Sequence, residues 1–186
     1  MAIMKVLGGI LGGVLTLWIG WGVYVIYTTE RPPHEVTQRL GSGVEVRQYA
    51  EQTWISTAYT SDRGAFPVLG SYIFGRNQEQ ETVAMTAPVI TGEKMTFILP
   101  AGVTQENAPT PDGQPIEFTT VPPRKVAALA FSWWVPEDRV ARKTAALLEV
   151  LREAGVETVG EPFLMRYNDP WTPPFLRRNE VGIEVR

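Results

Sequence analysis

The sequence predicts an α+β domain in which two strand–strand–helix–strand–strand repeats form a distorted antiparallel β-barrel with two flanking helices. From residue 44 onward, short alternating strand patterns and two amphipathic segments occur twice in the same order. Residues 6–27, by contrast, contain no charged residue, which predicts one N-terminal transmembrane helix before the domain. We therefore expect a membrane anchor over residues 1–30, a linker over 31–43 and the folded domain over 44–186.

The uncharged run, VLGGILGGVLTLWIGWGVYVIY, is 22 residues long. A helix of that length, at about 1.5 Å per residue, crosses a hydrocarbon core of roughly 30 Å. Tryptophan and tyrosine gather in its second half, as in an interfacial belt. An uncleaved anchor is favoured over a signal peptide because no small-x-small cleavage site follows. The prediction is a single-pass membrane protein that contacts the bilayer through residues 6–27.

The orientation of this anchor is poorly encoded, with a slight lean towards the N-terminus inside and the domain outside. Two overlapping glycine pairs, Gly8 with Gly12 and Gly9 with Gly13, have the spacing at which membrane helices approach closely. Because glycine is common in membrane helices in general, these pairs predict no more than a weak homodimer.

The first repeat begins with strands at residues 44–49 and 53–60. The segment SDRGAFPVLGSYIFG is predicted to be helical, with Asp62 as its cap and Gly75 at its end. Phe66, Leu69 and Ile73 share one face of this helix. Pro67 removes a hydrogen bond unless it lies in the first turn. Strands at residues 83–89 and 94–100 complete the repeat.

The second repeat has strands at residues 115–121, 125–134, 161–168 and 180–185. Between the second and third of them, residues 136–154 form the clearest helix pattern in the chain, with proline at its start and glycine after its end. Its predicted buried stripe consists of Val140, Leu147, Leu148 and Leu151. Prolines interrupt the last strand pair of both repeats.

The composition excludes several classes of function. The chain has no cysteine, which removes disulfides, thiolate metal sites, covalent haem attachment and thiol nucleophiles. His34 is the single histidine and lies in the predicted linker, so we interpret it as a solvated residue and predict no catalytic residue and no metal site. The net charge of −3 and the absence of a basic run give no reason to expect a nucleic-acid partner.

Three stretches together resemble one protein family. GSYIFGRNQEQETVAMTAPVI, KMTFILP and RYNDPWTPPFLRRNEV are similar to the SOUL/haem-binding protein family, in the family's order. The pairing of AMTAPV with a terminal PWTPPFLRRNEV is the specific part of the match. The resemblance implies a barrel-like α+β fold and non-covalent binding of haem or another tetrapyrrole, without enzymatic activity.

A porphyrin is a flat apolar disc with carboxylates on one edge, so a site for it needs apolar walls and a cation at the rim. The resemblance places a basic residue at the start of the first helix, which Arg63 matches, and another in the C-terminal loop, where Thr172 stands instead. The predicted haem-binding residues are Arg63, Phe66, Leu69, Tyr72, Ile73, Met85, Trp171, Phe175 and Arg177.

Several alternatives remain open at this point. Arg177, Arg178 and Glu180 could instead form an ion-pair network that pins the last strand. The two-repeat architecture also resembles the effector-binding domains of drug-responsive regulators, which hold other flat molecules. A buried glutamate would favour that alternative, and the sequence offers no strong candidate for one. A tetrapyrrole-modifying enzyme is disfavoured. The favoured function is a haem carrier, buffer or sensor.

Overall fold

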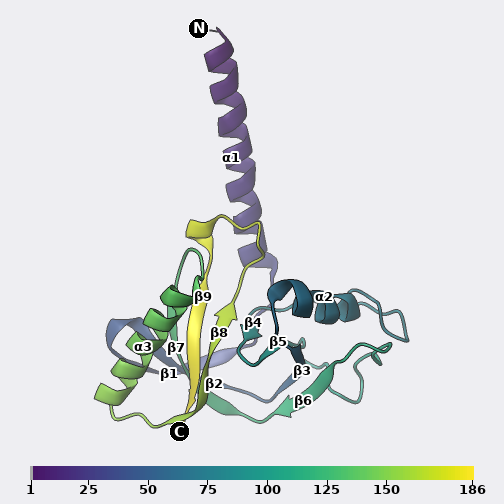
Figure 1. Ribbon diagram of the computed structural model, residues 1–186, viewed down its shortest axis with the longest axis vertical. Helices are drawn as coiled ribbons and strands as arrows, with labels where there is room; N and C mark the ends of the chain where they lie inside the picture. Colours follow the sequence, from purple (N-terminus) through teal and green to yellow (C-terminus); the bar gives the residue numbers. More distant parts are fainter. Residues whose placement is uncertain (1) are drawn as a thin grey trace.

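The computed structural model describes residues 2–186, and side-chain surroundings from residue 12 onward. Nine strands form one antiparallel sheet in the order β1-β2-β7-β9-β8-β4-β5-β3-β6. The sheet curls, and the helices α2 (Asp62–Ile73) and α3 (Glu137–Glu153) lie beside different parts of it (Figure 1). The helix α1 (Ala2–Thr28) extends away from the sheet.

The strands carry the numbering of Figure 1. They are β1 His34–Arg39, β2 Val44–Tyr49, β3 Gln52–Ala58, β4 Val89–Thr91, β5 Lys94–Ile98, β6 Glu117–Val121, β7 Arg124–Phe131, β8 Thr158–Arg166 and β9 Asn179–Val185. Two short 3₁₀ helices, η1 (Gly41–Gly43) and η2 (Pro174–Leu176), precede β2 and β9.

The predicted repeat is confirmed. The first copy is β2-β3-α2-β4-β5 and the second is β6-β7-α3-β8-β9. When each strand is exchanged for its counterpart in the other copy, the sheet order from β2 to β6 maps onto itself in reverse. The two copies are therefore related by an approximate twofold axis, and they meet where β4 pairs with β8.

One face of the sheet carries both helices, and we call it the helix face. Leu147 and Leu151 of α3 pack there against β2, β7 and β9, whereas Leu69 and Ile73 of α2 pack against β3 and β5. Neighbouring side chains on a strand point to opposite sides. The alternate residues therefore form the opposite face, where a third cluster includes Ile98, Met165 and Tyr167 among its members.

The strand expected at residues 125–134 ends at Phe131, the one expected at 161–168 spans Thr158–Arg166, and two further differences are larger. Residues 34–39, inside the expected linker, form β1, because the edge of β2 offers unpaired backbone groups that even a polar segment can bond. Residues 83–88 were expected to be a strand, but β4 begins at Val89. In this stretch Ala87 donates its backbone hydrogen bond to Glu30, and Pro88 has no N–H to donate.

The predicted single-pass anchor, and with it the predicted location of the protein at a membrane, is corrected. Among the residues that the structure describes, no helix is both long enough and apolar enough to span a bilayer. α1 is long, but glycine, threonine, tryptophan and tyrosine separate its aliphatic residues between Gly12 and Thr28. The predicted bilayer contact through residues 6–27 lies partly outside the residues whose side chains are described. Gly8 and Gly9 lie outside them as well, so the structure gives no support to the homodimer predicted from the two glycine pairs.

Two adjacent leucines of α3 provide a test of the helix face. Leu147 is fully buried, whereas Leu148 is 37 % exposed although the sequence placed both in one stripe. Leu147→Ala should lower the free energy of unfolding by about 3 kcal/mol, since it leaves a cavity in the core. Leu148→Ala should lower it by less than about 1 kcal/mol. Urea unfolding followed by circular dichroism measures both, and equal losses would contradict the assignment of the faces.

Candidate functional site

The start of α2 is fixed by local hydrogen bonds and by one distant ion pair. The hydroxyl of Ser61 caps the helix by accepting a hydrogen bond from the backbone N–H of Gly64, at 3.2 Å, where the sequence had suggested Asp62 as the cap. Asp62 instead accepts from Nη2 of Arg166, at 2.8 Å, and from the hydroxyl of Tyr59, at 3.0 Å. The hydrogen bond from Arg166 lowers the pKa of Asp62. The first repeat is thereby tied to the end of β8 in the second.

The predicted residues of α2 fall into two groups. Leu69, Tyr72 and Ile73 are fully buried in the core under the helix, and the Tyr72 hydroxyl donates to the carbonyl of Pro109 at 2.7 Å. Burial raises the pKa of Tyr72 to about 12. Arg63 is exposed and Phe66 is 40 % exposed, so these two side chains are accessible to a ligand.

Phe66, Met85 and Arg63 differ in their surroundings. The ring of Phe66 leans on Phe97, with 5.3 Å between the ring centroids, which holds it against the helix face while leaving part of it accessible. Met85 is partly buried against the same core cluster. Arg63 forms no ion pair with any residue that the structure describes, so its charge is free to meet a ligand.

The C-terminal loop, residues 167–178, is held in shape by two of its own side chains. The carboxylate of Asp169 accepts hydrogen bonds from the backbone N–H groups of Trp171 and Thr172, at 2.6 and 3.0 Å. Nε of Arg177 donates to the carbonyl of Thr172 at 2.8 Å, and its guanidinium lies 4.3 Å from the ring centre of Trp134. Burial lowers the pKa of Arg177. Arg177 is thus engaged with the loop itself.

Other loop residues differ sharply in exposure. Trp171 is 76 % exposed and Phe175 is 43 % exposed. Thr172 is fully buried and donates its hydroxyl hydrogen bond to Asp169 at 3.0 Å, so it cannot reach a carboxylate on a ligand. The loop therefore presents aromatic surface on a fixed backbone.

The structure connects the two groups of accessible residues through one ion pair. Asp62 stands beside Arg63 at the start of α2, and its partner Arg166 is the last residue of β8, from which the loop departs. Among the described residues, no hydrogen bond joins Arg63 or Phe66 directly to the loop.

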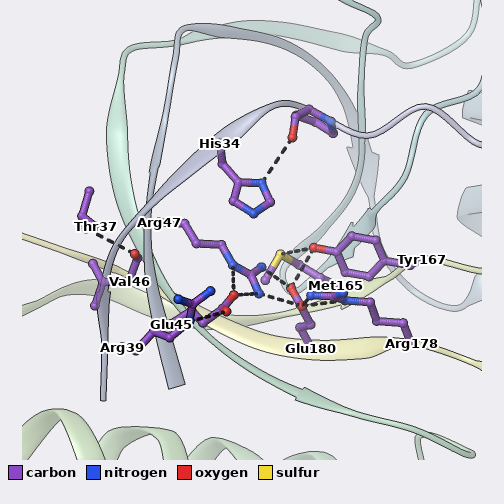
Figure 2. A network of polar contacts seen from close by, with 11 residues as sticks. His34, Thr37, Arg39, Glu45, Val46, Arg47, Met165, Tyr167, Arg178 and Glu180 are labelled. Carbon is purple, nitrogen blue, oxygen red and sulfur yellow. Dashed lines mark hydrogen bonds and ion pairs between the residues drawn. The ribbon is translucent and has the colours of Figure 1, made fainter. Parts of the chain in front are cut away.

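A buried network of charges lies on the opposite face of the sheet (Figure 2). Glu180 is fully buried and accepts hydrogen bonds from Nη1 and Nη2 of Arg47, at 2.7 and 3.0 Å. Tyr167 donates to it at 2.7 Å and Nη2 of Arg178 at 2.6 Å. Arg47 also pairs with Glu45 at 2.9 Å. Of the alternative ion-pair network at the last strand, the structure shows the pair of Arg178 and Glu180, whereas Arg177 bonds loop carbonyls instead.

The electrostatics of this network keep it charged. Burial alone would raise the pKa of Glu180, but the hydrogen bonds and charge of Arg47 outweigh it and lower that pKa. Burial and the nearby Glu180 charge raise the pKa of Tyr167, which stays a hydrogen-bond donor. The His34 ring lies tilted against Tyr49 with 5.1 Å between ring centroids, and burial together with Arg47 lowers the pKa of His34.

Little free space remains beside this network. A cavity beside Tyr49, Arg124 and Phe163 has a volume of about 10 Å³, which holds one water molecule. Pockets for drug-sized ligands are roughly 300–1,000 Å³. A tetrapyrrole therefore cannot enter here without rearrangement of the side chains. Among the described residues, no group of three His, Asp or Glu side chains is placed to hold a metal ion.

Comparison with known proteins gives the family. The model of the SOUL haem-binding proteins matches residues 29–184, which is most of the chain. The chain belongs to the SOUL haem-binding protein family. This is a family of binding proteins. The match begins before β1 and so includes the segment that the sequence had suggested to be a linker. Among curated proteins, none matches the sequence.

Solved structures share the fold of this SOUL protein at low sequence identity. The crystal structure of the C-terminal domain of EcmrR has a TM-score of 0.54 at 14 % identity, over 77 % of this chain and 96 % of that one. A complex of EcmrR with DNA has a TM-score of 0.57 at 15 % identity, over 77 % of this chain and 57 % of that one. A hydrolase from Listeria innocua has a TM-score of 0.51 at 11 % identity, over 81 % of this chain and 94 % of that one. At these identities the likeness shows the fold alone, and it gives no support to the expected absence of a nucleic-acid partner.

The buried network gives a prediction for stability. Arg47→Met should lower the free energy of unfolding at pH 7 by about 3–5 kcal/mol, because Glu180 loses its main partner in the protein interior. The folded-state pKa of Glu180 is lowered, so its contribution is present above the unfolded pKa and is lost as pH falls through the folded one. Because the variant is less stable from the start, it should also unfold at a higher pH during acid titration, while its deficit relative to the wild type shrinks as Glu180 becomes protonated.

Urea unfolding at pH 7 and acid titration by circular dichroism measure the two effects. The control is Arg152→Met, which removes an exposed ion pair with Glu149 and should change neither curve. An Arg47→Met protein as stable as the wild type would show that the buried pair contributes nothing.

Proposed function

We propose that this SOUL domain binds haem or another tetrapyrrole non-covalently, at a surface formed by the start of α2 and the C-terminal loop. Family membership supports the ligand class. The accessible residues predicted for the site, Arg63, Phe66, Trp171 and Phe175, supply one cation and three aromatic rings. Leu69, Tyr72 and Ile73 support the site from the core beneath α2.

The observation that carries the proposal is the exposure of Trp171 on an ordered loop. The indole is 76 % exposed, yet the backbone on either side is fixed by Asp169 and Arg177. Exposing a large aromatic side chain forgoes the free energy that its burial would give. A flat apolar ligand recovers that free energy by stacking on the ring. The loop is ordered beforehand, so binding does not have to order it.

The cation at the proposed rim is Arg63. Arg177 bonds the loop carbonyls, and Arg178 bonds Glu180, so both are engaged within the protein. A guanidinium free of protein partners suits the carboxylate edge of haem. No axial ligand is proposed, because His34 lies on β1 with its ring against Tyr49. Contacts of this kind give reversible binding, which suits a carrier, buffer or sensor.

The alternative ligand class, flat cations, is less well supported. Such a ligand needs an unpaired negative charge, and the buried glutamate that the sequence did not reveal is Glu180. Both of its carboxylate oxygens already accept hydrogen bonds from arginine. The net charge around it leaves no negative potential for a cationic ligand to neutralise. Enzymatic activity is not proposed.

Substitution of Trp171 tests the aromatic wall. Haemin titration of the wild type, followed through the Soret band, should be saturable. Trp171→Ala should weaken haemin binding by about 1–3 kcal/mol, the value of an aromatic stacking contact. The melting temperature should stay within about 2 °C, because the ring is largely exposed. Phe74→Ala removes another ring, 66 % exposed, at the far end of α2 and should leave the affinity unchanged. A Trp171→Ala protein that is strongly destabilised, but whose folded fraction binds haemin as tightly as the wild type, would show that Trp171 supports the fold and does not contact the ligand.

Substitution of Arg63 tests the rim. Arg63→Ala should weaken haemin binding about tenfold, as expected for one charge-assisted hydrogen bond. The same variant should bind a porphyrin without carboxylates as well as the wild type does, because the partner of the guanidinium is missing. Arg142→Ala, an exposed arginine of α3, is the matched control and should change neither affinity. An equal loss for both porphyrins would show that Arg63 does not meet a carboxylate.

A further inference from the structure

The helix α1 touches the C-terminal loop at two points. Nε1 of Trp18 donates a hydrogen bond to the carbonyl oxygen of Trp171 at 2.6 Å. One turn further along, a Cβ atom added to Gly22 would lie 2.7 Å from Cδ of Pro173 and 3.2 Å from Cδ1 of Leu176. Figure 1 shows the loop beside the C-terminal part of α1, although the two are separated by most of the sequence.

The contact is confined to one side of α1. Trp18 and Gly22 are four residues apart, which places them on the same face of a helix. Gly22 is the buried residue within positions 12–28, whereas Gly20 has no atom within 4 Å of a Cβ added there. The side chains of Pro173, Leu176 and Thr172 lie so close to Gly22 that a methyl group at this position would have to displace Pro173.

The contact orders the loop without covering its aromatic ring. The carbonyl of Trp171 is held by Trp18, while the Trp171 side chain stays 76 % exposed. Asp169 and Arg177 fix the loop from within, and α1 fixes it from outside. A ligand that stacks on Trp171 thus meets a backbone with three separate attachments, each of which lowers the entropic cost of binding.

We propose that α1 positions the C-terminal loop for its ligand, with Trp18 and Gly22 as positioning residues. This inference rests on the proposed function, because the site that α1 adjusts is the one assigned to the loop. Displacement of α1 lowers the affinity for the ligand. Ligand binding in turn stabilises the docked helix, since coupling between two equilibria is reciprocal.

Four variants of the full chain test the coupling: Gly22→Ala, Gly20→Ala, Pro173→Ala, and Gly22→Ala combined with Pro173→Ala. The two glycine substitutions add the same methyl group and the same gain in helix propensity. The methyl at position 22 alone meets Cδ of Pro173. Haemin titration should show affinity about fivefold lower for Gly22→Ala, the value of one lost hydrogen bond, and unchanged for Gly20→Ala.

The double variant supplies the rescue. Alanine at position 173 has no Cδ atom, so it makes room for the methyl group at position 22. The double variant should recover most of the lost affinity relative to Pro173→Ala alone, which gives a non-additive cycle. If the loss of haemin affinity in the double variant equals the sum of the losses in the two single variants, the two residues do not act through their contact, and the proposal is overturned.

Hydrogen exchange at the amides of residues 169–177 reports on the contact without any ligand. Exchange should be faster in Gly22→Ala than in Gly20→Ala, with the same melting temperature in both. Equal exchange in the two variants would overturn the proposal, and so would faster exchange with unchanged haemin affinity. If the wild type takes up no haemin, the proposed function fails, and the exchange data alone decide whether α1 orders the loop.

Discussion

The ion pair between Arg47 and Glu180 joins β2 to β9 across the strand that lies between them. Arg47 is opposite Val126 in β7, and Glu180 is opposite Ala130, so the guanidinium must pass over Ala128 to reach the carboxylate. Small side chains in β7 provide that passage. Removing either charge takes from the other its most buried partner, so that Glu180 keeps only Arg178 and Arg47 keeps only Glu45 as an ion-pair partner. The strand order of this half of the sheet and the alanines of β7 are therefore parts of one arrangement.

This arrangement also leaves little room for a ligand beside it. The cavity next to the network holds about one water molecule. Two larger open hollows lie elsewhere, of about 500 Å³ beside Val46 and Val185 and of about 530 Å³ beside Lys94 and Glu117. On our proposal a flat molecule binds instead on the outside of the domain, which requires aromatic rings on an ordered backbone. The C-terminal loop meets that requirement because Asp169 and Arg177 satisfy its backbone polar groups locally. The proline-rich loop thus keeps the side chains of Trp171 and Phe175 exposed to solvent.

The sequence predicted those features that depend on nearby residues. Periodicity located α3, and the order of strands gave the repeat. In β9 the alternation placed Glu180 on the face opposite Val181. Whether Glu180 is exposed to solvent or buried on that face depends on its ion pair with Arg47, which is 133 positions away. The polar segment that forms β1 carries no strong strand pattern of its own, because its pairing is supplied by β2. The apolar character of α1 was visible, whereas its approach to the loop at Gly22 depends on a contact that no local pattern encodes.

The meeting of the two repeats at β4 and β8 has a mechanical consequence. That joint consists of three residue pairs, from Val89 opposite Arg166 to Thr91 opposite Leu164. β7 and β9, by contrast, pair over seven positions. β4 pairs with β5 over three positions as well, so the narrow waist of the sheet lies around β4, and bending concentrates where the fewest hydrogen bonds resist it. The Asp62–Arg166 ion pair links α2 of the first repeat to β8 of the second across this waist. A molecule resting on both α2 and the C-terminal loop would span the same waist, and part of its binding free energy would be spent on keeping the two halves from flexing against each other.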